Sequence, residues 1–595
     1  MRWRAPFAIA AAGLLMPGCG GTVSVPDTAT SPRALEWATY GQSQSRTFYN
    51  PHETRITRDT VGTLRPKWRY LTGAVVTASP SVAYVDVPGE GRIEVVFIAS
   101  WDGNFYALRA SNGSRLWQFT MKPHPGASFP QAASAEIVTV AGEQRVYVAG
   151  GMTVYCLNAA TGALRWEFDA GTGCTTCDAQ TERNEVLSSP AVVGDLVYFG
   201  MDVNDTGVGK GGLFAVRALD GGLAWYFDLE TSTTCRPRAT DTVRRFDGYH
   251  TAAELGLPDD FFATRPGCNF DRRGTACGNI WSSVAVDPAR RLLYTASSNC
   301  DTDGDPNTPP PPPPMPPYDE AIFAVSFDGD PAWVWRPRAV DNDDLAFGGV
   351  PNLFEVEIGG AVRQVVGVGC KDGTYYLLDR SGVNALTQRI EPYWRTQVVP
   401  GGAIGGIIAS AAVDDDMVLF ATAIGVSTAT FQRPSAWGLR ASDGAMLWSN
   451  RMALPGFGPT TAIPGVTFMG NILGNLAAYG TADGASLASF PLDGPVSSAA
   501  TVLDGELFVG SGTGARGGSP AEQAFRQSTV PSNVNAFCLP DADDCPETLC
   551  DDGDPCTYDF HAAGGCRSEP APDTIPCVVG TQDGVCRSGV CEVLL

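Results

Sequence analysis

Short runs of alternating apolar and polar residues, separated by glycine turns, extend through most of the 595-residue chain. Residues 369–382 (GCKDGTYYLLDRSG) predict a strand, a tight Asp-Gly turn and a second half-buried strand with aromatic and aliphatic residues. Helical periodicity is scarce beyond residue 30, and the 68 glycines and 44 prolines suit a turn-rich chain. The pattern predicts an all-β protein.

The same unit recurs as a glycine turn, a short aromatic-aliphatic strand, a small residue and then x-Gly-x-x-x-Trp. Copies span residues 102–117, 152–166, 212–225, 321–333, 373–386, 436–448 and 474–488. Most lie about 40 to 60 residues apart, which is the period of a propeller blade. In the fifth copy Leu386 stands in place of the final tryptophan. We expect the repeat tryptophans to pack between adjacent blades.

Trp68 ends an eighth copy whose earlier strands come from residues 496–538. Pairing of N-terminal and C-terminal strands in one blade closes the ring and removes free sheet edges. The sequence therefore predicts an eight-bladed β-propeller over residues 37–538, with a disulfide-rich module at residues 539–595.

Residues 1–19 predict a signal peptide, with a basic start and an apolar stretch that is short for a membrane span. The sequence LMPGC resembles a bacterial lipobox, which implies lipidation of Cys19, and simple secretion is the alternative. Residues 20–36 form a small, polar tether. No other stretch is apolar for long enough to span a membrane, so we expect membrane contact through the lipid anchor only.

The net charge and the cysteine content indicate which partners, cofactors and cellular compartments suit the protein. The net charge of −23 argues against a nucleic-acid partner. Seventeen cysteines suit an oxidising compartment. Setting Cys19 aside, eight lie between Cys156 and Cys370 and eight between Cys538 and Cys591, which favours two disulfide sets. No Cys-x-x-Cys precedes a histidine, so a c-type haem site is not expected.

The repeat resembles the tryptophan-docking repeat of the pyrroloquinoline-quinone (PQQ) enzymes, which are eight-bladed propellers. The opening WATYG at residues 37–41, with Arg46 and Tyr49, is similar to the start of those dehydrogenases. Non-catalytic lipoprotein propellers of the outer-membrane barrel-assembly machinery share the repeat. It therefore predicts the fold and leaves activity open.

The resemblance implies a quinone at the propeller centre, a bridging Ca²⁺ or lanthanide with oxygen ligands, and a carboxylate that accepts the substrate's hydroxyl proton. Lys371 matches the Lys or Arg that contacts the quinone, just before a Tyr-x-Leu-Asp-Arg strand. The alternative is a surface lysine beside a hairpin turn.

The resemblance also implies metal ligands. Asn299 ends a strand similar to the one that supplies an amide oxygen, although Ser298 replaces the usual glycine. Asp205 stands where the family has glutamate, with Asp202 nearby and Glu185 as a substitute. A polar insertion without metal is the alternative.

Two further groups follow from the same resemblance. Asp343, and next Asp341, match the catalytic base that follows a tryptophan, and Asp343 also serves as a metal ligand; a solvated loop is the alternative. Cys174 and Cys177, with Arg183, are similar to the cysteine ring and arginine beside the quinone. An ordinary disulfide or a redox pair is the other interpretation of these cysteines.

Three segments lie outside the repeat. Residues 228–279 form a long cysteine-containing insertion, expected to cap one face or to bury blade edges, and residues 300–318 form a proline-rich loop. The module at residues 539–595 resembles cysteine-rich repeats of slime-mould and myxobacterial surface proteins, which suggests attachment or adhesion.

Together these features predict an exported protein of the cell envelope, in the periplasm or on the outer membrane. The leading hypothesis is a PQQ- and Ca²⁺-dependent dehydrogenase that oxidises an alcohol and passes electrons to cytochrome c or another external carrier. The alternative is a non-enzymatic propeller that binds proteins in envelope assembly or at the cell surface. The sequence favours the enzyme hypothesis, and the non-enzymatic propeller is kept as the alternative.

Overall fold

The computed structural model describes most of the chain between residues 36 and 593. The described residues are 36–124, 131–170, 185–202, 211–229, 232–235, 242–245, 248–251, 279–298, 318–338, 344–414, 416–423, 434–512, 532–562, 565–571, 576–579 and 582–593. These residues form strands joined by turns, with one short 3-10 helix, η2 (Val61–Thr63). Within these ranges no helix is long and apolar enough to cross a membrane.

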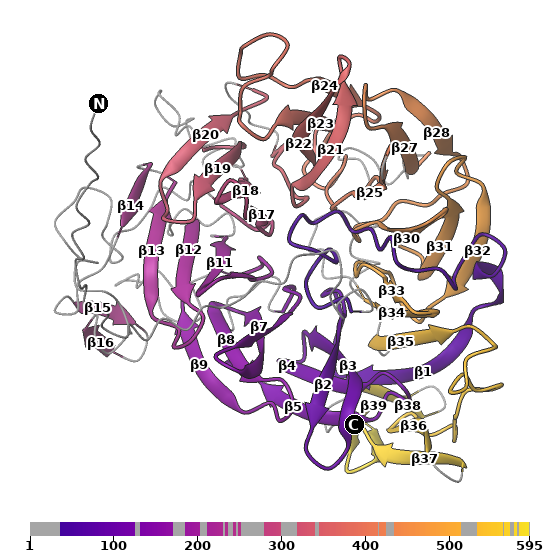
Figure 1. The fold of residues 1–595 in the computed structure, drawn as a ribbon. Helices are drawn as coiled ribbons and strands as arrows, with labels where there is room; N and C mark the ends of the chain where they lie inside the picture. Colours follow the sequence, from indigo (N-terminus) through magenta and orange to yellow (C-terminus); the bar gives the residue numbers. More distant parts are fainter. Residues whose placement is uncertain are drawn as a thin grey trace, which may run out of the picture.

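Eight antiparallel sheets stand around a central axis, so the predicted eight-bladed propeller is confirmed (Figure 1). Blade 1 consists of β2 (Ser81–Val87), β3 (Gly91–Ser100), β4 (Asn104–Arg109) and β5 (Arg115–Thr120), and blade 2 consists of β6 (Glu136–Val140), β7 (Glu143–Gly150), β8 (Thr153–Asn158) and β9 (Leu164–Asp169). Blade 3 consists of β10 (Ala191–Val193), β11 (Leu196–Met201), β12 (Gly212–Arg217), β13 (Leu223–Asp228) and an additional strand, β14 (Thr233–Cys235). Blade 4 consists of β17 (Ala285–Asp287), β18 (Leu292–Ala296), β19 (Ile322–Ser326) and β20 (Pro331–Trp335). Blade 5 consists of β21 (Asn352–Ile358), β22 (Ala361–Gly369), β23 (Thr374–Asp379) and β24 (Trp394–Gln397), and blade 6 consists of β25 (Ala412–Asp414), β26 (Met417–Ala421), β27 (Ala436–Arg440) and β28 (Met446–Asn450). Blade 7 consists of β29 (Thr461–Ile463), β30 (Val466–Gly470), β31 (Asn475–Gly480) and β32 (Ser486–Pro491). Blade 8 consists of β33 (Thr501–Leu503), β34 (Glu506–Gly510), β35 (Ser532–Cys538) and β1 (Arg65–Thr72). A small hairpin, β15 (Thr242–Arg245) and β16 (Gly248–Thr251), belongs to the long insertion.

Blade 8 closes the ring because its outer strand comes from the N-terminal part of the chain. β1 pairs antiparallel with β35, with Tyr70 opposite Val534. The closure predicted from Trp68 is confirmed. The first and last segments of the propeller are thus joined by a full ladder of strand hydrogen bonds.

Tryptophans in the fourth strands of seven blades fasten each of these blades to the next, whereas β32, the fourth strand of blade 7, contains no tryptophan. In blade 1, Trp117 Nε1 donates to the Ala159 carbonyl at 2.9 Å, and the ring covers Gly162, which has a φ of 69°. A Cβ at Gly162 would overlap the indole, so glycine is required there. The same type of bond is made by Trp68, Trp166, Trp225, Trp333, Trp394 and Trp448. The expected packing of repeat tryptophans between blades is confirmed.

The assignment of Leu386 to the tryptophan position of blade 5 is wrong. Leu386 lies in the connection between β23 and β24 and is 56% exposed. Trp394, the first residue of β24, donates its indole N–H to the Ala441 carbonyl at 2.9 Å. The connection is longer in this blade than in the others, and it displaces the docking tryptophan from the spacing of the repeat.

Residues 37–50, here called the strap, run around the inside of the ring (Figure 1). Backbone or side-chain hydrogen bonds join the strap to the first strand of every blade. In chain order they link Trp37 to Val82, Ala38 to Ile137, Gln44 to Val192 and Val286, Ser45 to Leu353, Thr47 to Val413, Phe48 to Ala462, and Asn50 to Val502. The strap leaves where Arg55 donates to the Asp504 carbonyl, in the turn between the first and second strands of blade 8. One segment thus ties all eight blades together.

The described part of the C-terminal module consists of two small sheets. They are β36 (Thr557–Ala562) with β37 (Gly565–Pro570), and β38 (Pro576–Val579) with β39 (Gln582–Arg587) and β40 (Val590–Val593). The disulfides are Cys538–Cys545, Cys550–Cys566, Cys556–Cys586 and Cys577–Cys591. The expectation that these eight cysteines form their own disulfide set is confirmed.

The matching expectation for Cys156 and Cys370 is wrong, because both are buried free thiols. Cys156 lies in the core between blades 2 and 3, whereas Cys370 lies in the core between blades 4 and 5. A buried free cysteine packs as a small apolar residue, so an even cysteine count does not imply complete pairing.

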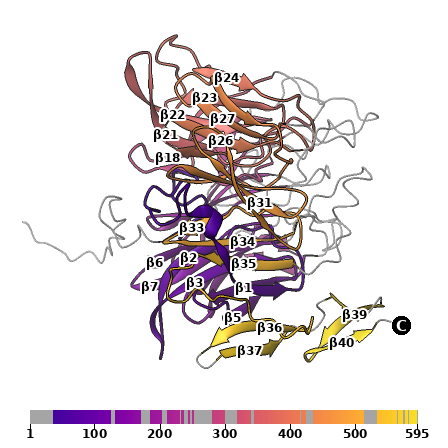
Figure 2. The same ribbon diagram turned by 90° about the vertical axis from the view of Figure 1, so that its right-hand side faces the viewer.

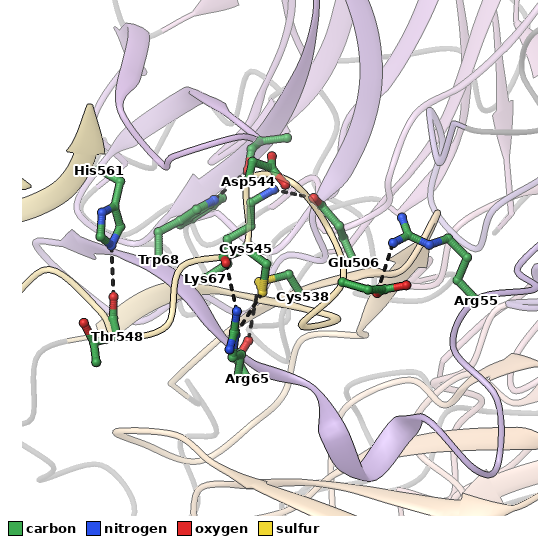
Figure 3. Close-up of a disulfide and its surroundings, with 12 residues drawn as sticks. Arg55, Arg65, Lys67, Trp68, Glu506, Cys538, Asp544, Cys545, Thr548 and His561 are labelled. Atoms are coloured by element: carbon green, nitrogen blue, oxygen red, sulfur yellow. Dashed lines mark hydrogen bonds and ion pairs between the residues drawn. A yellow bond between two sulfur atoms is a disulfide. The ribbon is translucent and has the colours of Figure 1, made fainter. Parts of the chain in front are cut away.

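The module packs on blade 8 and its neighbour (Figure 2). The Tyr558 ring lies 4.7 Å from the Tyr70 ring of β1, centroid to centroid. Next to the Cys538–Cys545 disulfide, Arg65 donates to the Cys545 carbonyl at 2.9 Å (Figure 3). β1 is the outer strand of its sheet, and an exposed edge strand can pair with other chains. The module therefore covers an edge that would otherwise be open.

An acidic cavity of about 340 Å³ lies at this junction. Glu94, Asp504, Glu506 and Asp544 line it, and Lys67 pairs with both Glu506 and Asp544 (Figure 3). Burial raises the pKa of Glu94 to about 8, and the nearby Glu506 carboxylate adds to this shift. Burial likewise raises the pKa of Glu506 to about 7, against the opposing effect of Lys67.

These shifts predict a pH-dependent stability. A carboxyl group with a raised pKa binds a proton more tightly in the folded protein, so its stabilising contribution is complete below about pH 4.5 and is lost as the pH rises to about 8. Glu94→Gln should flatten this dependence and stabilise the protein at pH 8 by at least about 1 kcal/mol. Denaturant unfolding of both proteins between pH 5 and pH 8.5 checks this, with the exposed Glu592→Gln as control. Equal pH profiles for wild type and Glu94→Gln would contradict it.

Candidate active site

The turns between second and third strands lie at the same end of the propeller as the segments that enter each first strand, because neighbouring strands are antiparallel. At this end a residue one or two positions after the second strand donates its backbone N–H to the entering segment. In blades 3, 4 and 5 these bonds join Asp202 to Glu185 at 2.8 Å, Ser298 to Asn279 at 2.7 Å and Lys371 to Ala346 at 3.1 Å. Turns and entering segments of three adjacent blades thus form one layer.

Lys371 is charged but only 7% exposed. Its Nζ lies 2.7 Å from Asp344 Oδ1 and 5.5 Å from the centroid of the Trp281 ring. A buried ammonium group needs a paired carboxylate, and an aromatic face adds cation–π attraction. The ammonium is therefore a fixed positive charge beside a flat indole that is itself partly exposed.

Asp372 makes the turn after Lys371 rigid. Its Oδ1 accepts the Thr374 N–H at 2.8 Å, and its Oδ2 accepts the Tyr376 hydroxyl at 2.6 Å. Gly373 has a φ of 81°, and a Cβ there would overlap a backbone carbonyl. Burial, with the charge of Asp372, raises the pKa of Tyr376, so the hydroxyl remains a donor at physiological pH. The backbone that carries Lys371 is held in one conformation.

Arg338 connects this turn to the segment before blade 5. Its Nη1 donates to Asp372 Oδ2 at 2.6 Å, and its Nη2 donates to Glu320 Oε2 at 3.0 Å and to the Leu345 carbonyl at 2.7 Å. Burial opposes the charge of Arg338, but the Glu320 and Asp372 carboxylates outweigh it and raise the pKa of Arg338. The guanidinium remains charged and binds three groups at once.

Two acidic residues at this site have unusual backbone conformations. Glu320 has a φ of 42° and Asp344 a φ of 51°, and neither is glycine. Such conformations cost of order 1–3 kcal/mol each and cluster at functional sites. Both side chains contact site cations, Glu320 through Arg338 and Asp344 through Lys371.

Of the residues predicted from sequence, Lys371 is placed by the structure, and its alternative as a surface lysine is wrong because the side chain is buried. Glu185 is fully buried and bridges Asp202 through backbone hydrogen bonds. The remaining predicted residues lie outside the described part of the chain: Cys19, Cys174, Cys177, Arg183, Asp205, Asn299, Asp341 and Asp343.

The structure adds three residues that sequence reasoning missed. Asp344 follows the predicted Asp343, and only the structure shows which carboxylate contacts Lys371. Trp281 precedes the first strand of blade 4, whereas the docking tryptophans lie in fourth strands. Its place outside the repeat was a signal in the sequence that could have identified it as a candidate site residue. No repeat or motif marks Arg338.

The donor set fits a flat, anionic ring system. The partly exposed Trp281 ring offers a surface for stacking, and the Lys371 ammonium offers a charge to an anionic or carbonyl oxygen. In the described ranges, groups of three possible metal ligands occur only in the C-terminal module, where most of their members are disulfide cysteines.

The chain is similar to known proteins in both sequence and fold. Residues 37–401 match the family described as "PQQ: Glucose/ethanol/alcohol dehydrogenase, beta-propeller domain". A polyvinylalcohol dehydrogenase from Pseudomonas sp. is 25% identical over 559 residues, which cover 84% of this chain and 76% of the relative. Quinate/shikimate dehydrogenase (quinone) from Acinetobacter baylyi is 24% identical over 409 residues, and the match covers 62% of this chain and 46% of that protein.

Solved structures show the same fold. Quinohemoprotein alcohol dehydrogenase from Comamonas testosteroni has a TM-score of 0.63 and 18% identity, over 87% of this chain and 83% of its own. A europium-containing methanol dehydrogenase has a TM-score of 0.63 and 17% identity, over 85% of this chain and 98% of its own. With eight blades, tryptophan docking and a match over more than half its length, the chain belongs to the PQQ-dependent dehydrogenase β-propeller family.

Proposed function

We propose that this protein is a PQQ-dependent dehydrogenase that oxidises an alcohol and passes the electrons to a separate carrier. The observation that carries the proposal is the buried Lys371 ammonium, held between Asp344 and the Trp281 ring in a propeller of this family. Lys371 combines a buried ion pair with an aromatic ring face, and this combination suits a planar ligand.

Trp281 and Lys371 would hold the quinone, one through its ring face and the other through its charge. Asn299, Asp205 and Asp343 are the proposed ligands of a Ca²⁺ ion, which prefers oxygen donors. Arg183, Cys174 and Cys177 are proposed to line the quinone. A quinone held by these residues would supply a hydride acceptor for the substrate carbon.

Asp344 is the proposed proton acceptor for the substrate hydroxyl, in place of the neighbouring Asp343 and Asp341. Its carboxylate already lies at the Lys371 ammonium, and that charge favours its ionised form, which a base requires. Lys371 keeps the carboxylate oriented while its ammonium faces the ring. The chain's own groups thus bind, orient and accept a proton at the Asp344 carboxylate.

The substrate class and the electron carrier are proposed from the relatives and from the sequence. The similar proteins include dehydrogenases of polyvinylalcohol and of quinate or shikimate, so we propose a hydroxyl-bearing substrate. The printed sequence has no Cys-x-x-Cys-His, so a separate acceptor such as cytochrome c is proposed. The proposed location is the cell envelope, with an anchor at Cys19.

The test is reconstitution of the full chain with PQQ, with and without Ca²⁺, followed by dye reduction with primary alcohols, secondary alcohols and polyvinylalcohol. PQQ-dependent dye reduction is expected. Asp344→Asn should lower kcat by about 10²- to 10⁴-fold and retain quinone binding, because a general base contributes about that much. Bound quinone without dye reduction on any alcohol would contradict the proposed function.

A further inference from the structure

We propose that Arg338 is a positioning residue that holds the Lys371–Asp344 pair in its geometry. Its consequence for quinone binding rests on the proposed function. The geometric claim does not, since it concerns residues that contact one another in the protein itself.

Arg338 and Asp344 lie immediately before and after residues 339–343, and both are tied to the same turn. Arg338 binds Asp372 at 2.6 Å, and Asp344 binds Lys371 at 2.7 Å. Lys371 and Asp372 are adjacent in sequence, so two neighbouring residues each hold one end of this segment. The segment begins with a cation that pairs with the anionic Asp372 and ends with an anion that pairs with the cationic Lys371. Exchanging the partners would place like charges together, so the charges determine which residue binds each end of the segment.

Arg338 also acts on the backbone beside Asp344. Its Nη2 donates to the Leu345 carbonyl at 2.7 Å, and the Cys370 thiol donates to the same oxygen at 3.0 Å. Asp344 has a φ of 51°, a conformation that persists only when its surroundings enforce it. The bond to the next carbonyl is such a constraint. Arg338 therefore reaches the Lys371–Asp344 pair through the backbone as well as through Asp372.

Charge balance points the same way. The contacts described here contain three carboxylates, Glu320, Asp372 and Asp344, and two cations, Arg338 and Lys371. Without Arg338, Lys371 is the one cation of this set, and Asp372 on the adjacent residue competes with Asp344 for it. A lysine at position 338 would keep the charge but lacks the planar fork that binds Asp372 and Glu320 together.

Arg336 offers a matched control two residues away. Its Nη2 binds Asp319 Oδ2 at 2.5 Å, and Asp319 is fully buried. Arg336→Gln removes a buried arginine–carboxylate pair of the same kind, but the pair involves Asp319 and not the Lys371 turn. A general loosening of the segment should appear in both variants.

The first measurement needs no cofactor. The rate of reductive methylation of Lys371 in the folded full-length protein is followed by peptide mass spectrometry. We expect Arg338→Met to raise the rate at least about tenfold, Arg338→Lys to raise it less, and Arg336→Gln to leave it near the wild-type value. Arg338→Lys retains the charge, so it provides the answer if Arg338→Met does not fold. An unchanged rate in the Arg338 variants, or an equal rise in Arg336→Gln, would overturn the inference.

The second measurement is a double-mutant cycle on PQQ affinity with Arg338→Met and Lys371→Met. If Arg338 acts through Lys371, the double variant binds no more weakly than Lys371→Met alone. Losses that multiply would overturn the inference. If wild type does not bind PQQ, the proposed function fails, and the methylation rates alone decide the role of Arg338.

Discussion

Replacing Lys371 by methionine should weaken PQQ binding about 10- to 150-fold, the loss expected when a charged group no longer pairs with a ligand oxygen. The ammonium lies 5.5 Å from the centroid of the Trp281 ring, so a ring stacked on Trp281 would lie close to it. Methionine keeps a flexible side chain of similar length but carries no charge. Equilibrium titration of the apoprotein with PQQ, followed by quenching of tryptophan fluorescence, measures the change.

Lys122→Met is the matched control for this prediction. Lys122 enters blade 2 at the same end of the propeller, but its side chain is 57% exposed and pairs with Glu167. Exposed ion pairs contribute little, so PQQ affinity should stay within about a factor of two of wild type. Equal weakening in both variants would mean that net charge, and not the position of Lys371, governs binding.

Replacing Arg46 by methionine should lower the free energy of unfolding by about 3–5 kcal/mol, the typical result of breaking a buried charged network. Arg46 is fully buried in the strap and donates to the Val284 carbonyl at 2.8 Å, Thr39 Oγ1 at 2.7 Å and the Tyr40 carbonyl at 2.5 Å. Methionine leaves these acceptors without a donor inside the ring. Denaturant unfolding of both proteins measures the loss.

The control for the strap is Arg440→Met on the outside of blade 6. Arg440 pairs with Asp443 at 2.8 Å, and its side chain is 47% exposed. The expected change is within about 0.5 kcal/mol, as for most surface substitutions. If Arg46→Met were as mild as Arg440→Met, the strap would not be the element that ties the blades together.

The blade order could be predicted from sequence because seven of the eight blades repeat the same local chemistry. An indole N–H meets a carbonyl of the next blade, and its ring needs a glycine in the left-handed region. That pairing leaves a regular signal in the sequence. The error at Leu386 arose where the connection before Trp394 lengthened, because the spacing of a repeat gives no information about an insertion inside it.

The site was less predictable because its residues lie in the connections. Lys371 could be found because its turn belongs to the repeat, whereas Asp344 lies in a segment without periodicity, where a choice among adjacent carboxylates has no register to guide it. The strap, too, was only partly predictable from the sequence. Its resemblance to the family start was visible at Trp37 and Arg46, but its contact with all eight blades depends on residues distant in sequence.

The cysteines show the limit of counting. The prediction that an even number of cysteines forms a complete disulfide set was correct for the C-terminal module, where disulfides replace a hydrophobic core. It failed for Cys156 and Cys370, which pack in the cores between blades. Burial, which a count does not contain, separates the two cases.

Trp281, Lys371 and Asp344 form the proposed PQQ site. Its most direct test is equilibrium dialysis of the full-length apoprotein against PQQ in the presence of Ca²⁺, with bound quinone measured by its absorbance. We expect saturable binding of one quinone per chain at micromolar or lower concentration, weakened in Lys371→Met and unchanged in Lys122→Met. Absence of saturable binding by folded wild-type protein at micromolar PQQ would contradict it.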